Sequence, residues 1–259
     1  MCYGGEYLYS EITEKLHWVN HKDLHKLEKS GRLKHSDKNR FYPRHIVPLS
    51  IFEDGEYRVV PARFDLIPRD YMSNLRDASI ADLVKLKNSR KKSPMSGKPT
   101  GYSSWNARVE SIQDLFSFRM AWNQNRRAII PITAFLERPN EDDTPDEFKN
   151  KEFLLSLDML SGLGCVWDVI ERQGEKLYSF AIVTQDSDGH RIRKEIHHIR
   201  MPTLLTLEES GQWIDPKVGA DQAHALVYQF PGEKMKIAEI IRPPSQSKEP
   251  DKDEPNLLL

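Results

Sequence analysis

The stretch Ala128-Ile129-Ile130-Pro131-Ile132-Thr133-Ala134-Phe135-Leu136-Glu137 decides how the rest of the chain is interpreted. It is a run of apolar and β-branched residues that ends on a carboxylate, which is typical of a buried strand. Similar short apolar runs occur at residues 46–49, 57–60, 153–155, 165–167 and 178–183. Turn residues separate the first two of these at 53–56, and those at 173–175 predict a hairpin. Because strands and helices follow one another without regular alternation, the sequence predicts an α+β fold with a mainly antiparallel sheet.

Helices are predicted near both ends of this strand-rich region. Residues 11–30 place apolar side chains on roughly one face, and a late helix is predicted to begin at 208–214. Two segments resemble surface insertions: residues 138–150 are acidic and turn-rich, and residues 83–99 hold six basic residues and no acid. The basic segment is either a solvated loop or a strip that contacts phosphates. The polar, proline-rich residues 243–259 are predicted to be disordered, which leaves one domain over 1–242.

Composition excludes several classes of protein. The formal net charge of −1 over 259 residues means that any nucleic-acid-binding surface must be local. The sequence predicts no membrane-spanning helix and no secretory signal. Two cysteines, Cys2 and Cys165, are too few for a disulfide framework or a cysteine-rich zinc site. No nucleotide-phosphate or metalloprotease signature is present. We therefore expect a cytoplasmic protein without a metal or another cofactor.

Cys2 is the most suggestive single residue. A small second residue usually allows the initiator methionine to be removed, which would leave an amine and a thiol on neighbouring carbons. An α-amino group titrates near ~7.7–8.0, so part of it is neutral and nucleophilic at cytoplasmic pH. Towards an aldehyde such a pair forms an imine that the thiol closes to a five-membered thiazolidine. The alternative is that Met1 stays and Cys2 is simply a small buried residue.

Three further clusters could support that chemistry. Asn106 and Arg108 lie together in residues 104–111, and an amide and a guanidinium can orient carbonyl or phosphate oxygens. Glu137 ends the apolar run and can exchange protons there. His197 and His198 are adjacent acid/base candidates, of which one is expected to enter any site. Each cluster also has an ordinary structural explanation: a capped helix start, a solvent-facing strand end and two structural histidines.

Taken together, the clusters resemble the SRAP family (SOS response-associated peptidase), whose members act at abasic sites in single-stranded DNA. Four motifs occur in the family's order over about residues 2–210, and Pro48 falls where a conformation-setting proline is usual. The motifs are Met1-Cys2, Asn106-Ala107-Arg108-Val109-Glu110-Ser111, the run from Arg127 to Glu137, and Ile196-His197-His198-Ile199-Arg200-Met201-Pro202.

The resemblance implies a fold, a reaction and a role for each matched residue. It implies one domain with a barrel-like core flanked by helices, acting as a monomer that associates with the nucleoid when on DNA. Cys2, freed by self-removal of Met1, would crosslink to the abasic aldehyde. Asn106 would hold the amine and substrate oxygens, Glu137 would shuttle protons, and the motif histidine would assist. The candidate DNA contacts are Arg108, Arg200, Pro48, Lys91 and Lys92.

The chain departs from the family pattern at several positions. Tyr3-Gly4 stands where Gly-Arg is frequent, so one phosphate contact is missing or supplied elsewhere. Phe64-Asp65 replaces Trp-Gly, and Leu136 and Arg138 replace the aromatic pair around Glu137. The histidine motif has one extra residue. Counting back from Arg200 selects His198, which we prefer, whereas counting forward from Ile196 selects His197.

Two other functions remain open at this point. A mature N-terminal cysteine is also the nucleophile of one class of amidohydrolase, in which its own amine serves as the base. A non-covalent single-strand binder would keep the arginines and the basic segment but would not depend on Cys2. A salt titration distinguishes these functions. Binding through phosphate contacts weakens steeply as salt rises, whereas a covalent adduct survives high salt.

Overall fold

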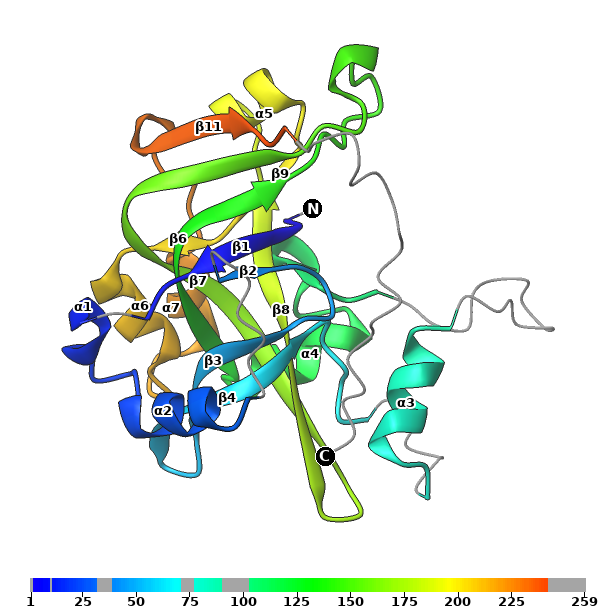
Figure 1. Cartoon of the computed structure of the whole chain (residues 1–259), viewed down its shortest axis with the longest axis vertical. Helices are drawn as coiled ribbons and strands as arrows, with labels where there is room; N and C mark the ends of the chain where they lie inside the picture. Colours follow the sequence, from blue (N-terminus) through cyan, green and yellow to red (C-terminus); the bar gives the residue numbers. More distant parts are fainter. Residues whose placement is uncertain (1, 10, 32–38, 71–76, 90–102, 242–259) are drawn as a thin grey trace.

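The computed structural model of the chain describes residues 2–9, 11–31, 39–70, 77–89 and 103–241. Its strands form one sheet in which β3, β4, β8, β7 and β6 pair in a closed circuit (Figure 1). The strands are β1 (Gly4–Tyr7), β2 (Arg40–Phe41), β3 (Ile46–Glu53), β4 (Glu56–Phe64), β5 (Asn106–Arg108), β6 (Arg127–Glu137), β7 (Phe153–Arg172), β8 (Glu175–Asp186), β9 (Arg200–Pro202), β10 (Leu204–Leu205) and β11 (Met235–Glu239). All pairings are antiparallel except those of β8 with β4 and β5. The predicted α+β class and barrel-like core are confirmed.

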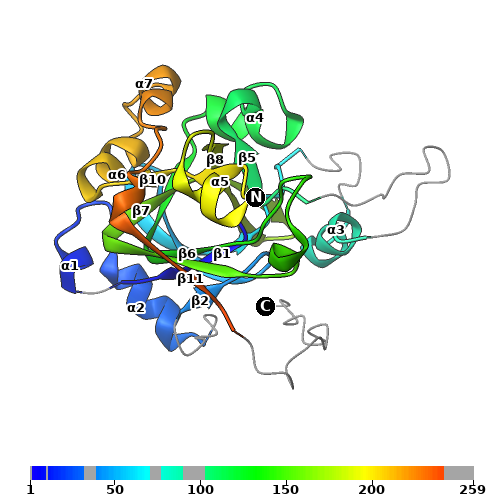
Figure 2. The same ribbon diagram turned by 90° about the horizontal axis from the view of Figure 1, so that it is seen from above.

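Helices surround this barrel, with α4, α6 and α7 gathered on one side of it (Figure 2). The α-helices are α1 (Glu11–Glu14), α2 (His21–Lys29), α3 (Ile80–Lys87), α4 (Phe116–Asn123), α5 (Arg191–Ile196), α6 (Leu207–Ile214) and α7 (Ala220–Ala225). Single 3-10 turns cover Val109–Ser111, Asp146–Phe148 and Gly232–Lys234. In the described residues no helix is long and apolar enough to cross a membrane.

The apolar runs are buried on both faces of the strands, and this produces two cores. Alternate residues such as Leu49, Ile130 and Phe180 point inside the barrel, and all five barrel strands contribute to that cluster. Their neighbours, such as Ile129, pack outside against α2, α4 and α6, where Trp213 lies. Double burial explains why these strands appear as continuous apolar runs rather than alternating ones.

Two predicted boundaries are wrong for local physical reasons. The runs at 153–155 and 165–167 belong to one strand, β7, which is 20 residues long. The apolar pattern between them is interrupted by Gly162 and Gly164. These glycines let α6 and Thr203 approach the strand closely. A Cβ at Gly162 would lie 2.0 Å from Ser210 Oγ. The predicted helix 11–30 is two helices, because Asn20 begins α2 by accepting a hydrogen bond from the Asp23 amide.

The start of the predicted basic insertion at 83–99 is helical and not a surface loop. Residues 83–87 belong to α3, and Lys87 is buried rather than solvated. Its Nζ lies 2.6 Å from Asp65 Oδ1, so this charge is used inside the protein. The acidic segment 138–150 contains only one 3-10 turn. The predicted disordered tail, residues 243–259, lies outside the described residues.

Candidate active site

Cys2 lies two residues before the start of β1, the strand that extends the sheet beside β6. Its side chain is fully buried in the barrel core, and its Sγ donates to the Gly4 carbonyl oxygen at 3.6 Å. Burial, and then the nearby Glu137 carboxylate, raise the pKa of the Cys2 thiol well above its ordinary value. The thiol is therefore protonated at neutral pH and needs a base to become a nucleophile.

Glu137 and His198 form a buried pair next to this thiol. Glu137 is the last residue of β6, and the pairing of Gly4 with Leu136 brings that strand end beside Cys2. His198 follows α5, and its Nε2 lies 3.0 Å from Glu137 Oε2. Both side chains are almost completely excluded from solvent. Groups that are distant in sequence are thus brought together by the pairing of β1 with β6.

Counting protons shows what this pair can do. His198 Nδ1 lies 2.5 Å from the carbonyl oxygen of Arg138. A carbonyl only accepts, so Nδ1 carries a proton. The other ring nitrogen, Nε2, faces the Glu137 carboxylate at 3.0 Å. An imidazole and a carboxylate side by side, close to a thiol, are groups that can perform general acid/base chemistry.

Asn106 holds the backbone at Cys2. It begins β5, which pairs in parallel with β8, and its Nδ2 donates to the Cys2 carbonyl oxygen at 2.9 Å. Its Oδ1 is buried and accepts no hydrogen bond from the described residues. One amide therefore fixes Cys2 and leaves an acceptor unused beside it.

His197 points away from this cluster. It ends α5 in the left-handed conformation, with φ 51°, which turns it from its neighbour. Its Nδ1 lies 3.5 Å from Glu141 Oε2, and its ring packs against Phe148 with centroids 4.9 Å apart. Of the two adjacent histidines, the structure brings His198 to Glu137, which in turn lies beside the Cys2 thiol.

The two arginines predicted to contact DNA have different environments. Arg108 is exposed at the end of β5. Arg200 is buried, and its guanidinium makes a two-pronged ion pair with Glu110 at 2.8 and 2.9 Å and donates to the Thr184 carbonyl. Arg200 thus joins β9 to the 3-10 turn that contains Glu110, and this burial argues against the expected phosphate contact.

The remaining predicted DNA contacts fall into two groups. Pro48 lies buried in the middle of β3, opposite Pro61 of β4, so the expected contact with DNA is not supported. Lys91 and Lys92 lie outside the described residues.

Two features were missed by the sequence analysis. Arg138 had been noted only as a departure from the family pattern, yet its guanidinium lies 3.9 Å from the centre of the Tyr3 ring. Asp65 accepts from Lys87 Nζ at 2.6 Å and from the Ser104 amide at 2.8 Å, two residues before Asn106. The register of β1 against β6 would have revealed the first feature. No sequence signal pairs Asp65 with Lys87.

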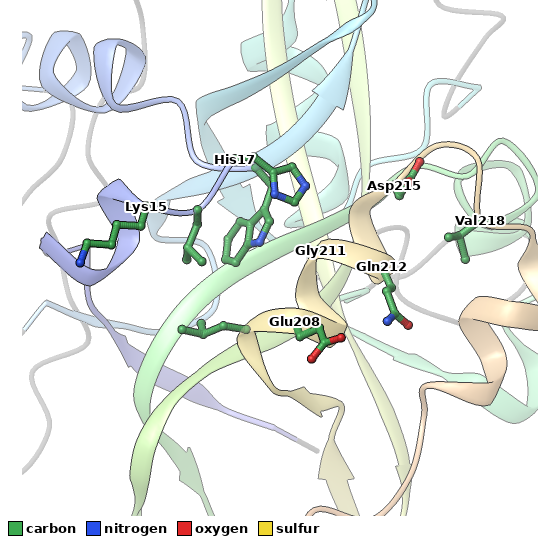
Figure 3. Close-up of a pocket in the computed structure, with 10 residues that line it drawn as sticks. Lys15, His17, Glu208, Gly211, Gln212, Asp215 and Val218 are labelled. Atoms are coloured by element: carbon green, nitrogen blue, oxygen red, sulfur yellow. The ribbon is translucent and has the colours of Figure 1, made fainter.

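A pocket of about 420 Å³ lies elsewhere, between the segment after α1 and helix α6 (Figure 3). His17, Glu208 and Asp215 line it together with Trp18, which belongs to the core outside the barrel, whereas Cys2 belongs to the core inside it. The described residues contain no group of three or more His, Cys, Asp or Glu side chains arranged to hold a metal ion.

Comparison with known proteins places this geometry in context. The model of the family described as SOS response associated peptidase (SRAP) matches residues 15–243. Abasic site processing protein YobE of Bacillus subtilis is 30% identical over 142 residues, which are 54% of this chain and 62% of YobE. YoaM of the same organism, also called an abasic site processing protein, is 27% identical over 192 residues, 73% of this chain and 81% of YoaM. The matched part is thus less than two thirds of the length of YobE.

Solved structures share the fold. A protein from Bordetella bronchiseptica superimposes with a TM-score of 0.64 at 17% identity, covering 93% of this chain and 100% of the other. One from Bacteroides thetaiotaomicron gives a TM-score of 0.56 at 22% identity, covering 83% of this chain and 88% of the other. With the family match over most of its length, this chain belongs to the SOS response associated peptidase (SRAP) family.

Proposed function

We propose that this protein processes abasic sites in single-stranded DNA by trapping the sugar aldehyde covalently on Cys2. The observation that carries the proposal is the buried thiol of Cys2 beside Glu137, whose Oε2 lies 3.0 Å from His198 Nε2. The names of its relatives YobE and YoaM support the substrate class. Neither the pocket near α6 nor a metal is needed for this chemistry.

The first step is removal of Met1 by hydrolysis of the bond between residues 1 and 2. Water adds to the Met1 carbonyl carbon, and the leaving Cys2 amine takes up a proton. Glu137 and His198 supply the acid and the base for these transfers. Asn106 holds Cys2 still through the 2.9 Å bond to its carbonyl, and its unused Oδ1 can accept from the new amino group.

The second step joins Cys2 to the ring-opened sugar. The neutral amine adds to the aldehyde carbon and expels one water to give an imine. The thiol sulfur then bonds to that carbon, and the thiol proton passes through Glu137 to the nitrogen. The complete burial of the thiol supports this order, in which the amine reacts first and the sulfur closes the ring.

The proposed partner is single-stranded DNA, held by Arg108 and, outside the described residues, by Lys91 and Lys92. Arg108 is supported by its exposure two residues from Asn106. We propose that the protein acts as a monomer in the cytoplasm and at the nucleoid. Two free thiols, Cys2 and Cys165, support a reducing compartment.

Intact-mass spectrometry tests the reaction. The protein is measured alone and after incubation with a single-stranded oligonucleotide that carries one abasic site. We expect loss of Met1 and a denaturation-resistant adduct. Its mass should exceed that of the mature protein by the mass of the oligonucleotide minus one water. Cys2→Ala should form no adduct, whereas Cys165→Ala, which removes the other buried thiol, should form it normally.

Two other outcomes would redirect the assignment. A mature Cys2 that forms no adduct but releases ammonia from glutamine would indicate an amidohydrolase. Binding that weakens with salt, with no adduct under any condition, would indicate a non-covalent single-strand binder. Self-removal of Met1 is checked separately with Glu137→Gln, which should keep Met1 if the protein itself cleaves the bond.

A further inference from the structure

Arg138 places a positive charge at the edge of the proposed reaction centre. Gly4 pairs with Leu136, and the Tyr3 amide also donates to the Leu136 carbonyl oxygen at 3.0 Å, so the end of β6 and Arg138 after it lie beside the residues that precede β1. Its backbone carbonyl accepts from His198, and Glu137 precedes it in the chain. No other part of this residue takes part in the proton transfers described above.

The guanidinium is held in place but remains accessible. It lies over the Tyr3 ring at 3.9 Å, which is a close cation–π contact. Its side chain is 42% exposed, and one terminal nitrogen donates to the buried Glu152 carboxylate at 3.4 Å. Its Nε is buried and has no hydrogen-bond partner in the described residues. Arg200 is more deeply buried, and its two terminal guanidinium nitrogens donate to Glu110 and Thr184.

Position 4, at the start of β1 and two residues after Cys2, cannot carry such a charge. A Cβ at Gly4 would lie 2.1 Å from the Phe41 carbonyl oxygen, which is backbone and cannot move aside cheaply. Residue 4 is therefore restricted to glycine here. The neighbouring strand β6 supplies a cation close to Cys2 instead.

We propose that Arg138, oriented by Tyr3, binds the phosphate next to the abasic sugar. A guanidinium presents a planar set of donors that matches a phosphate, and one face covered by an aromatic ring leaves its edge for that contact. The inference rests on the proposed function, because the phosphate belongs to the same strand as the trapped sugar. Arg138 and Tyr3 are positioning residues for the substrate.

The test separates binding from chemistry. The probe is a single-stranded oligonucleotide with a tetrahydrofuran abasic analogue, which has no aldehyde and binds only non-covalently. Affinity is measured over a range of salt concentrations. Arg138→Gln should bind on the order of tenfold more weakly at low salt and should lower the slope of log affinity against log salt by about 0.7, the value for one phosphate contact in a single strand.

Three variants sharpen the result. Arg138→Lys should keep the slope but recover only part of the affinity, since the charge remains and the planar fork is lost. Tyr3→Leu should weaken binding with an unchanged slope, because the cation is present but no longer oriented. Arg172→Gln is the matched control: Arg172 also has an unpartnered Nε but lies at the tip of the β7–β8 hairpin, away from the N-terminus (Figure 1).

The outcomes distinguish this inference from the proposed reaction. If Arg138→Gln has the same slope as Arg172→Gln while the wild-type protein forms the adduct, only the phosphate contact is wrong. If the slope falls as expected but no natural abasic site is trapped, the contact stands and the covalent reaction is wrong. Thermal unfolding of each variant shows whether the fold is kept.

Discussion

Glu137 and Asp65 are both carboxylates buried at strand ends, yet their partners differ in kind. Asp65 Oδ1 accepts from Lys87 Nζ and from the Ser104 amide, two donors that tie it to helix α3 and to the segment before β5. Glu137 lies beside His198 and the Cys2 thiol, both of which can give or take a proton. The first carboxylate can only anchor, whereas the second can carry protons.

The difference shows that burial alone does not identify a reactive carboxylate. Asp65 is connected to Ser104, two residues before Asn106, so it contributes to the site by fixing the segment that holds Cys2. In the proposed reaction Glu137 contributes through the exchange of a proton. Substitutions at the two positions are therefore expected to change different measurements, rate in one case and stability in the other.

The largest expected effect is on the rate of reaction at Glu137. In protein from which Met1 has first been removed by an added aminopeptidase, Glu137→Gln keeps the shape of the side chain but removes the proton carrier, so adduct formation should slow by about 10²–10⁴-fold. Single-turnover mass spectrometry with an abasic oligonucleotide measures this rate. Glu171→Gln, at the tip of the β7–β8 hairpin, serves as the control. A rate within threefold of the control would remove Glu137 from the mechanism.

The next effect is on stability at Lys87. Lys87→Met leaves the buried Asp65 carboxylate without its ion-pair partner, which should cost about 3–5 kcal/mol of unfolding free energy. The double variant Asp65→Asn/Lys87→Met removes both charges and should recover most of that loss. Denaturant unfolding gives the values. Equal losses in the single and double variants would show that the pair is not coupled.

A smaller effect is the pH dependence of stability that Lys87 confers. Burial outweighs the attraction of Asp65 and lowers the pKa of Lys87 to about 8. The unfolded chain, where lysine titrates near ~10.4, therefore binds more protons than the folded one between these values. Stability should rise with pH from about 8 to 10, by up to ~1.4 kcal/mol per pH unit. Urea unfolding at several pH values should show this rise in the wild type and not in Lys87→Met.

The smallest effect is expected at Glu110. Its side chain is half exposed, so its ion pair with Arg200 is screened by solvent. Burial acts to raise the pKa of Glu110, but the bonds from Arg200 outweigh it and lower that pKa. The stabilisation is thus present above the ordinary carboxyl range and is lost as pH falls through the lowered pKa. Glu110→Gln should cost about 1 kcal/mol or less at pH 7, and a much larger loss would mean that the buried Arg200 depends on this one partner.

Local pattern was sufficient for much of the fold. The apolar runs at 46–49, 57–60, 128–132 and 178–183 correspond to β3, β4, β6 and β8, because a strand buried on both faces needs such side chains. Local pattern failed where contacts from afar decide the conformation. The pattern predicts two strands where the 20-residue β7 is one, because the glycines in its middle allow packing against α6. It does not predict α3, because the last lysine of this helix is buried by pairing with Asp65.

The sequence by itself determined which chemistries were available: one cysteine at position 2, an amide at 106, a carboxylate at 137 and two adjacent histidines. Only the tertiary structure decided which of them meet. The left-handed turn at His197 sends one histidine outward and leaves His198 facing Glu137, and the hydrogen bond from the Tyr3 amide to the end of β6 leaves the Tyr3 ring against Arg138. The reason is physical: proton exchange and ion pairing act over about 3 Å, a distance set by strand pairing and backbone conformation and not by spacing along the chain.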